Sequence, residues 1–191
     1  MRGALSARDL ALVAVFAALI VVLGEAGTLY PFGAVVPITA QTLGVMLAGS
    51  VLGARRGLLA VGAFEVLVAA GLPLLAGGRG GLGVFTGPTA GFLLGWLPGV
   101  VVVGLIARWA LRAAGTRGLI PRLLVAHTVG GVAVVYALGV PMLAVQTQVS
   151  ISRALAISAV YLPGDAVKVV LASVVTAAVV RGYPRVLAQD R

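Results

Sequence analysis

Long apolar stretches dominate the sequence and alternate with short segments rich in glycine, proline and arginine. The apolar stretches lack the strict polar and apolar alternation of a strand with one solvated face, so they favour helices. Six of them approach the length of about 20 residues that a helix needs to cross a bilayer. They cover residues 10–27, 41–54, 57–75, 88–107, 123–145 and 164–180. This pattern predicts an all-α integral membrane protein with about six transmembrane helices.

The composition supports that prediction. Hydrophobic residues make up 61% of the 191 residues and charged residues only 10%, whereas about 25% of an average soluble domain is charged. No stretch has the composition of a soluble domain, so we interpret residues 1–191 as a single transmembrane domain whose first apolar stretch is a membrane helix and not a cleaved signal peptide. The chain has no cysteine and a single histidine, so the pattern predicts no metal site.

The arginines indicate an orientation in the membrane. Eleven of them fall in alternate connections between the apolar stretches: Arg2, Arg8, Arg55, Arg56, Arg108, Arg112, Arg117, Arg122, Arg181, Arg185 and Arg191. Only Arg79 and Arg153 fall in the other connections. Because lysine and arginine accumulate on the cytoplasmic side, both termini are expected in the cytoplasm, and the net charge of +9 needs no nucleic-acid partner.

Three connections are then expected on the outer side, over residues 28–40, 76–87 and 146–163. The second is a run of glycines that contains Arg79. Glycine lets the backbone approach a ligand closely, which predicts a loop that closes over a bound molecule. Glycine content alone equally fits a flexible connector.

Few ionisable residues lie inside the apolar stretches, and such residues are functional candidates because burying a charge in a membrane is costly. Asp165 and Lys168 are three residues apart, on one face of the last predicted helix. They can bind a ligand between them or neutralise each other as an ion pair. Glu65 and His127 are further polar positions, and His127 is expected to pack and hydrogen-bond. No pattern of paired carboxylates, metal ligands or a nucleophile with a base is present, so an enzyme is not expected.

Small residues at four-residue spacing predict close helix packing. Gly91, Gly95 and Gly99 follow this spacing in the fourth stretch. Ala14 and Ala18 follow it in the first stretch, where they predict a groove for another helix of this chain or of a partner.

Three segments of the sequence resemble the signature stretches of the BioY family, in the same order. They are VVPITAQTLGVMLAGSVLG (35–53), GLPLLAGGRGGLGVFTGPTAGFLLGW (71–96) and LPGDAVKVVLA (162–172). BioY proteins are the biotin-specific S components of energy-coupling-factor (ECF) transporters. The sequence departs from the family at Phe64, where a tyrosine is usual, at the intramembrane Glu65, and at Leu74–Leu75, which replaces the usual Val-Phe.

The resemblance implies an S-component-like bundle in a bacterial cytoplasmic membrane that binds biotin from outside. It also implies association with a transmembrane coupling subunit and a pair of ATPases, docked through Ala14 and Ala18, since the chain itself has no nucleotide-binding motif and needs no cofactor.

The chemistry of biotin suggests how a site would be divided. Asp165 can accept hydrogen bonds from the ureido N–H groups, and Lys168 can meet the carboxylate or hold Asp165 ionised and oriented. Gln41 adds an amide, and Arg79 is the other candidate for the carboxylate. Two other classes of function remain open at this point: a self-standing permease for another small vitamin or metabolite, and a membrane enzyme or other non-transport subunit.

Overall fold

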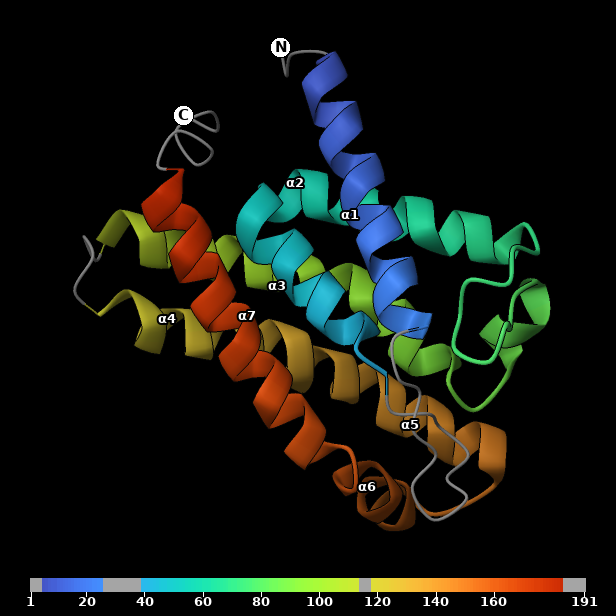
Figure 1. Cartoon of the computed structure of the whole chain (residues 1–191). Coiled ribbons are helices and arrows are strands. Elements are labelled where there is room, and N and C mark those ends of the chain that lie inside the picture. The colour runs from blue at the N-terminus through green and yellow to red at the C-terminus, as the bar shows by residue number, and fades with distance from the viewer. Residues whose placement is uncertain (1–4, 26–38, 114–117, 184–191) are drawn as a thin grey trace.

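The computed structural model describes residues 5–25, 39–113 and 118–183, and this part of the chain is helical apart from its connections and one isolated β-bridge. The elements are α1 (Ala7–Glu25), α2 (Gln41–Ala69), η2 (Leu82–Thr86), α3 (Ala90–Ala113), α4 (Leu119–Ala126), η3 (His127–Val134), α5 (Val135–Thr147), α6 (Ile151–Ala159) and α7 (Leu162–Gly182) (Figure 1). The all-α prediction is confirmed.

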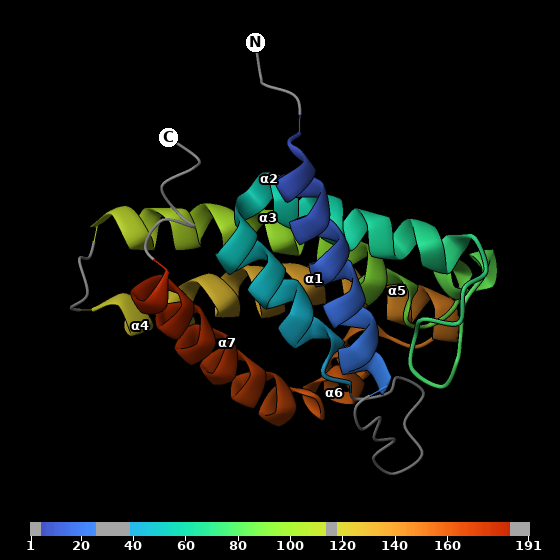
Figure 2. The same ribbon diagram turned by 45° about the horizontal axis from the view of Figure 1, so that its top comes forward.

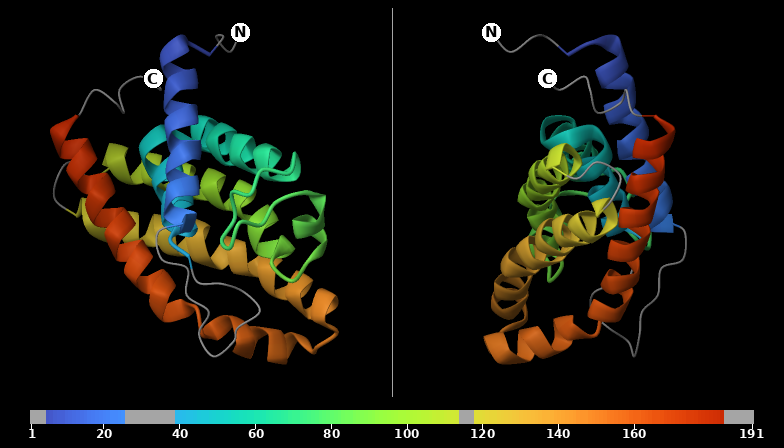
Figure 3. Two further views of the ribbon diagram at one scale, coloured as in Figure 1. Left: turned by 45° about the vertical axis from the view of Figure 1, so that its right-hand side comes forward. Right: turned by 90° about the vertical axis from the view of Figure 1, so that its left-hand side faces the viewer.

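Within the described residues, four helical segments are long and apolar enough to cross a membrane: α1, α3, the continuous rod formed by α4, η3 and α5, and α7. The start of α1 and the end of α7 both lie toward the same side of the bundle (Figures 1 and 3). This placement agrees with an even number of crossings.

The predicted stretch 41–54 and most of 57–75 form the two arms of one bent helix, α2, which ends at Ala69, so the second stretch was predicted six residues too long. The bend lies at Gly53, whose φ of 81° is in the region that favours glycine. Just after the bend, Gly57 lies so close to the first arm that an added Cβ would stand 2.9 Å from the Ala48 carbonyl oxygen. Arg56, beside the bend, forms a 2.8 Å ion pair with Asp9 of α1. The bend therefore fixes the direction of both arms and joins them to α1, which packs along α2 (Figure 2).

The glycine stripe of α3 packs as its spacing predicts. An added Cβ at Gly91 would stand 2.6 Å from the Leu138 carbonyl oxygen, and one at Gly99 would stand 2.8 Å from the Gly130 carbonyl oxygen. These close approaches place α3 directly against η3 and α5. The backbones pack closely because α3 carries no side chain at these glycine positions.

The third predicted outer loop, 146–163, is not wholly a loop, because it contains the helix α6. Ser150 caps this helix by accepting a hydrogen bond from the Arg153 backbone N–H, as expected for an N-cap serine. The buried face of α6 presents Ala154 to the cluster formed by α5. Sequence reasoning missed α6 because nine residues are too short to stand out as a membrane segment.

Candidate functional site

The structure has a cavity between the start of α2, the start of α3, the middle of the α4–α5 rod and the start of α7. It contains about 760 Å³ of space free of protein atoms, counting the part that opens to solvent. The lining includes Gln41, Thr42, Leu75, Arg79, Thr89, Phe92, Trp96, Tyr136, Tyr161, Asp165 and Lys168. All four residues that we predicted to contact substrate lie in this lining.

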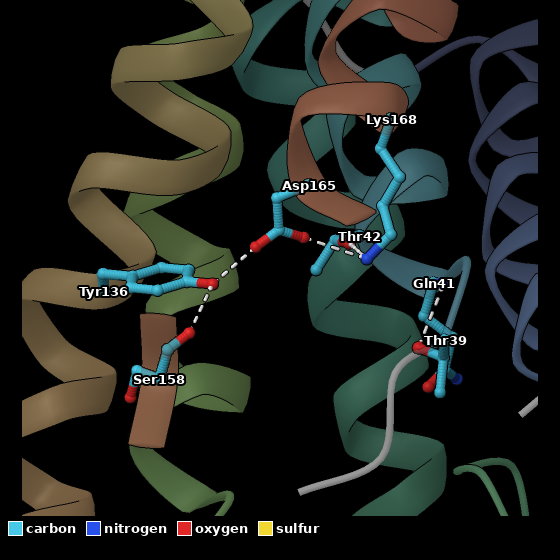
Figure 4. Close-up of polar contacts among 7 residues, drawn as sticks. All are labelled: Thr39, Gln41, Thr42, Tyr136, Ser158, Asp165 and Lys168. Carbon is cyan, nitrogen blue, oxygen red and sulfur yellow. Dashed lines mark hydrogen bonds and ion pairs between the residues drawn. The ribbon is translucent and has the colours of Figure 1, made fainter. Parts of the chain in front are cut away.

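Asp165 and Lys168 form the charged centre of the cavity. Pro163 lies in the first turn of α7 and starts the helix, so Asp165 also falls in that turn, where the helix dipole favours a negative charge. The Lys168 Nζ donates to Asp165 Oδ1 at 2.9 Å and to Thr42 Oγ1 at 3.0 Å (Figure 4). The sequence left open whether these two residues bind a ligand or neutralise each other as an ion pair. In the structure they form an ion pair that also lies on the cavity wall, so the two roles are compatible.

Tyr136 completes the network from the opposite wall. Its hydroxyl donates to Asp165 Oδ2 at 2.6 Å (Figure 4), and its ring meets Phe92 edge-on, with centroids 5.5 Å apart. Each carboxylate oxygen of Asp165 thus has one donor from the protein. The carboxylate is held in place and still has lone pairs for a ligand.

Arg79 is held beside the cavity by an ordered turn. The backbone N–H and carbonyl groups of Leu75 and Arg79 exchange two hydrogen bonds, of 3.0 and 3.2 Å. Gly77 and Gly78 have φ values of 73° and 68°, which lets the chain reverse within so few residues. The Arg79 Nε donates to the Ala76 carbonyl at 3.1 Å. The glycines at this point therefore build a tight turn that positions the guanidinium group.

The charges of the cavity are unevenly balanced. Asp165 neutralises Lys168, whereas Arg79 forms no ion pair with any residue in the described part of the chain. The cavity wall therefore contains a neutral polar group at α7 and one uncompensated positive charge at the turn.

Gln41 lies at the first position of α2 and is almost fully buried. Its side-chain amide donates to the Leu74 carbonyl at 3.1 Å. An added Cβ at Gly24 of α1 would stand 2.5 Å from that amide nitrogen, so Gln41 fits there because position 24 is glycine. Gln41 joins α1, α2 and the segment that leads to the Arg79 turn.

Sequence reasoning missed several lining residues, notably Tyr136, Thr42 and Trp96. Trp96 is 6% exposed, and its indole N–H has no hydrogen-bond partner among the described residues. Buried indole N–H groups usually have a partner, so this donor is available to a bound molecule. One feature of the sequence could have identified Tyr136 and Trp96: each places a hydrogen-bonding side chain inside an apolar stretch.

Other polar candidates lie elsewhere. Glu65 is buried in the second arm of α2 and does not line the cavity. His127 is fully buried, and its Nδ1 lies 2.9 Å from Ser173 Oγ. It joins the α4–α5 rod to α7, the packing role expected of it. Ala14 and Ala18 are exposed on α1, on the face that does not pack against α2.

Comparison with known proteins gives consistent matches over nearly the whole chain. The model of the BioY family matches residues 1–185. Proteins named biotin transporter BioY from Rhizobium etli and Rhodobacter capsulatus are 47% and 46% identical, and both alignments cover 94% of this chain and 97% of the relative.

A solved structure is also similar. The crystal structure of the S-component for biotin from an ECF-type ABC transporter superposes with a TM-score of 0.84, at 30% sequence identity and over 91% of each chain. The predicted S-component-like fold is therefore confirmed.

Proposed function

This chain belongs to the BioY family, and we propose that it takes up biotin as the substrate-binding S component of an ECF transporter in a bacterial cytoplasmic membrane. The observation that carries the proposal is the charge arrangement of the cavity. Among the described residues its lining combines the Asp165–Lys168 pair, with no net charge, and the unpaired cation Arg79. Biotin has a neutral ureido ring at one end and a carboxylate at the other. The relatives named as biotin transporters support the same substrate.

The orientation of biotin follows from electrostatics. A carboxylate beside Lys168 would also lie beside Asp165, whose repulsion offsets most of the attraction because the two charges are 2.9 Å apart. Arg79 has no such neighbour among the described residues, and a guanidinium group can bind a carboxylate with two hydrogen bonds. We therefore place the biotin carboxylate at Arg79.

The ureido ring then belongs at the α7 wall. Asp165 accepts from ureido N–H groups, while Lys168 and Tyr136 hold its carboxylate in place. This arrangement favours the second of the two roles considered for Lys168, which is to keep Asp165 ionised and oriented. Gln41 and the free indole N–H of Trp96 supply neutral hydrogen-bonding groups, and Phe92 provides apolar surface for the remainder of the ligand.

Energy for transport would come from partner subunits. The transporter relatives and the S-component fold support a coupling subunit with an ATPase pair. The exposed face of α1 with Ala14 and Ala18 is the proposed contact, since small residues let a partner helix approach closely. The protein itself binds substrate and hydrolyses no ATP in this proposal.

The proposed topology has six crossings, with the two arms of α2 counted separately and both termini in the cytoplasm. The arginine asymmetry and the common side of the α1 start and the α7 end support it. The cavity then opens toward the outer side.

Ligand binding to purified protein tests the function and the orientation together. We expect the protein to bind biotin and to bind neither thiamine nor riboflavin at comparable concentrations. The wild type should prefer biotin over its uncharged methyl ester, and Arg79→Gln should lose most of that preference by weakening acid binding. A matched variant, Arg153→Gln, removes the exposed arginine of α6 and should retain the preference for biotin over its methyl ester.

Different results separate the claims. Preferential binding of thiamine or riboflavin would overturn the biotin assignment. Undiminished acid-over-ester preference in Arg79→Gln would overturn only the placement of the carboxylate.

A further inference from the structure

The end of the bundle away from the cavity carries a second group of charged residues, which biotin binding does not involve. Here the end of α3, the start of α4 and the end of α7 come together (Figures 1 and 3). Their contact is a small apolar cluster that includes Ala107 of α3, Leu119 and Leu123 of α4, and Ala177 of α7. Each of the three helices carries an arginine near this end: Arg112 of α3, Arg122 of α4 and Arg181 of α7.

Arg122 and Trp109 form the centre of this group. The Arg122 guanidinium carbon lies 5.5 Å from the centroid of the Trp109 ring, a cation–π contact between α4 and α3. The Arg122 Nη1 is buried and has no hydrogen-bond partner within the described residues. A guanidinium N–H that is removed from water without an acceptor is costly, so this donor is suited to an anionic or carbonyl ligand.

Toward its C-terminal end, the exposed face of α3 changes from apolar to aromatic to basic residues, which is the order found where a helix leaves a membrane. Leu105, Trp109 and Arg112 follow each other at spacings of four and three residues, hence on one face. All three are exposed, Leu105 to 57% and Trp109 to 58%. An apolar residue, then tryptophan, then arginine is the sequence by which a helix passes from hydrocarbon through the headgroup layer.

The charge at this end is uncompensated in the described structure. Arg112, Arg122 and Arg181 form no ion pair with another described residue. Asp190 lies outside the described residues. An anion is therefore the ligand that this surface would bind.

We propose that Arg122, Arg112 and Trp109 form a binding site for the phosphate group of an anionic phospholipid. The buried Arg122 donor and the exposed Arg112 contact the phosphate, and the Trp109 ring and Leu105 contact the glycerol and acyl region. The exposed apolar and aromatic part of the face distinguishes this site from one for a soluble anion, which would have no use for Leu105. Basic pockets between helix ends at a membrane surface bind lipid headgroups in this way.

Quenching of Trp109 fluorescence tests the proposal directly. Trp109 is one of two tryptophans, and the other, Trp96, is buried in the cavity wall. Lipids with brominated acyl chains quench a neighbouring indole, so purified protein in phosphatidylcholine nanodiscs is titrated with brominated phosphatidylglycerol or brominated phosphatidylcholine. Trp109→Phe identifies the share of the signal that comes from Trp109.

We expect half-maximal quenching at a phosphatidylglycerol fraction about fivefold lower than for phosphatidylcholine, the effect of roughly one arginine contact with an anionic headgroup. Arg122→Gln should remove the preference. Arg112→Gln changes an exposed residue that the fold does not need, and it should reduce the preference too, whereas Arg153→Gln should retain it. Equal quenching by both lipids, or an unchanged preference in Arg122→Gln and Arg112→Gln, would overturn the proposal. Loss of the preference on addition of inorganic phosphate would assign the site to a soluble anion instead.

Discussion

Tyr136 of α5 donates a 2.6 Å hydrogen bond to Asp165 of α7, across 29 positions of sequence (Figure 4). This contact holds two walls of the cavity together and orients the carboxylate that we assign to the ureido ring. Because the donor acts on a charged acceptor in a poorly hydrated place, it is worth more than an ordinary hydrogen bond.

Tyr136→Phe should therefore weaken biotin binding about 10- to 100-fold, the equivalent of a hydrogen bond to a charged group. The ring and its edge-on contact with Phe92 are retained, so the protein should still purify as one monodisperse species. Calorimetric titration with biotin measures the effect. Tyr183→Phe, at a position that is 70% exposed, is the control, and a Tyr136→Phe protein with the same affinity as this control would show that the hydroxyl contributes nothing.

Removing one charge of the Asp165–Lys168 pair should destabilise the protein more than removing both charges. Asp165→Asn or Lys168→Met leaves one largely buried charge unpaired, at a cost of about 3–5 kcal/mol, and either should weaken biotin binding by orders of magnitude. The double variant should be more stable to heat than the sum of the single effects predicts. Thermal unfolding in detergent without biotin measures this coupling, and additive effects would mean that the pair is not a unit in the free protein.

Gly130→Ala should destabilise the protein although it adds a single methyl group. Its Cβ would stand 2.5 Å from the Val103 backbone nitrogen and 2.8 Å from the Gly99 carbonyl oxygen, so η3 and α3 must separate, at about 1–3 kcal/mol. Gly62→Ala is the matched control, since its Cβ would meet nothing closer than 4.0 Å and alanine favours a helix. Thermal unfolding compares the two, and equal midpoints would contradict the packing described for α3.

Replacing both Ala14 and Ala18 with tryptophan should abolish ATP-dependent uptake and leave biotin affinity nearly unchanged, because both positions are exposed on α1 and neither lines the cavity. Uptake into vesicles that contain the coupling subunit and ATPases gives the first readout, and binding to purified protein gives the second. Val174→Trp, on the exposed face of α7, should retain uptake. A parallel loss of binding in the α1 variant would assign the alanines to internal packing.

Cysteine labelling tests the proposed orientation. The chain has no native cysteine, so single cysteines at the exposed positions Leu82 and Arg112 report one connection each. A membrane-impermeant maleimide added to intact cells should label Leu82→Cys only, and both after the cells are opened. Labelling of Arg112→Cys alone in intact cells would reverse the topology.

Much of this protein could be read from its sequence, because the membrane imposes rules that act locally. Hydrocarbon requires each crossing segment to be apolar and to satisfy its own backbone hydrogen bonds, so long apolar runs predict helices wherever they occur. The glycine spacing of α3 predicted close packing for the same local reason. Asp165, Lys168, Gln41 and Arg79 were also identifiable, because a polar side chain in or beside an apolar run is costly and so stands out.

Only the tertiary structure decided which of these residues meet. The Lys168–Thr42 contact joins positions 126 residues apart, and the cavity forms because the bend at Gly53 turns the arms of α2 while α5 brings Tyr136 to α7. It also showed how the charges pair: among the described residues Asp165 pairs with Lys168 and Arg79 has no ion pair. This pairing is why we propose Arg79, and not Lys168, for the carboxylate, a choice that the sequence left open. Hydropathy measures how favourably a single residue transfers from water to an apolar solvent, so it can be read from the sequence. The free energy of a charge depends on the groups within a few ångströms of it, and those groups come from remote parts of the chain.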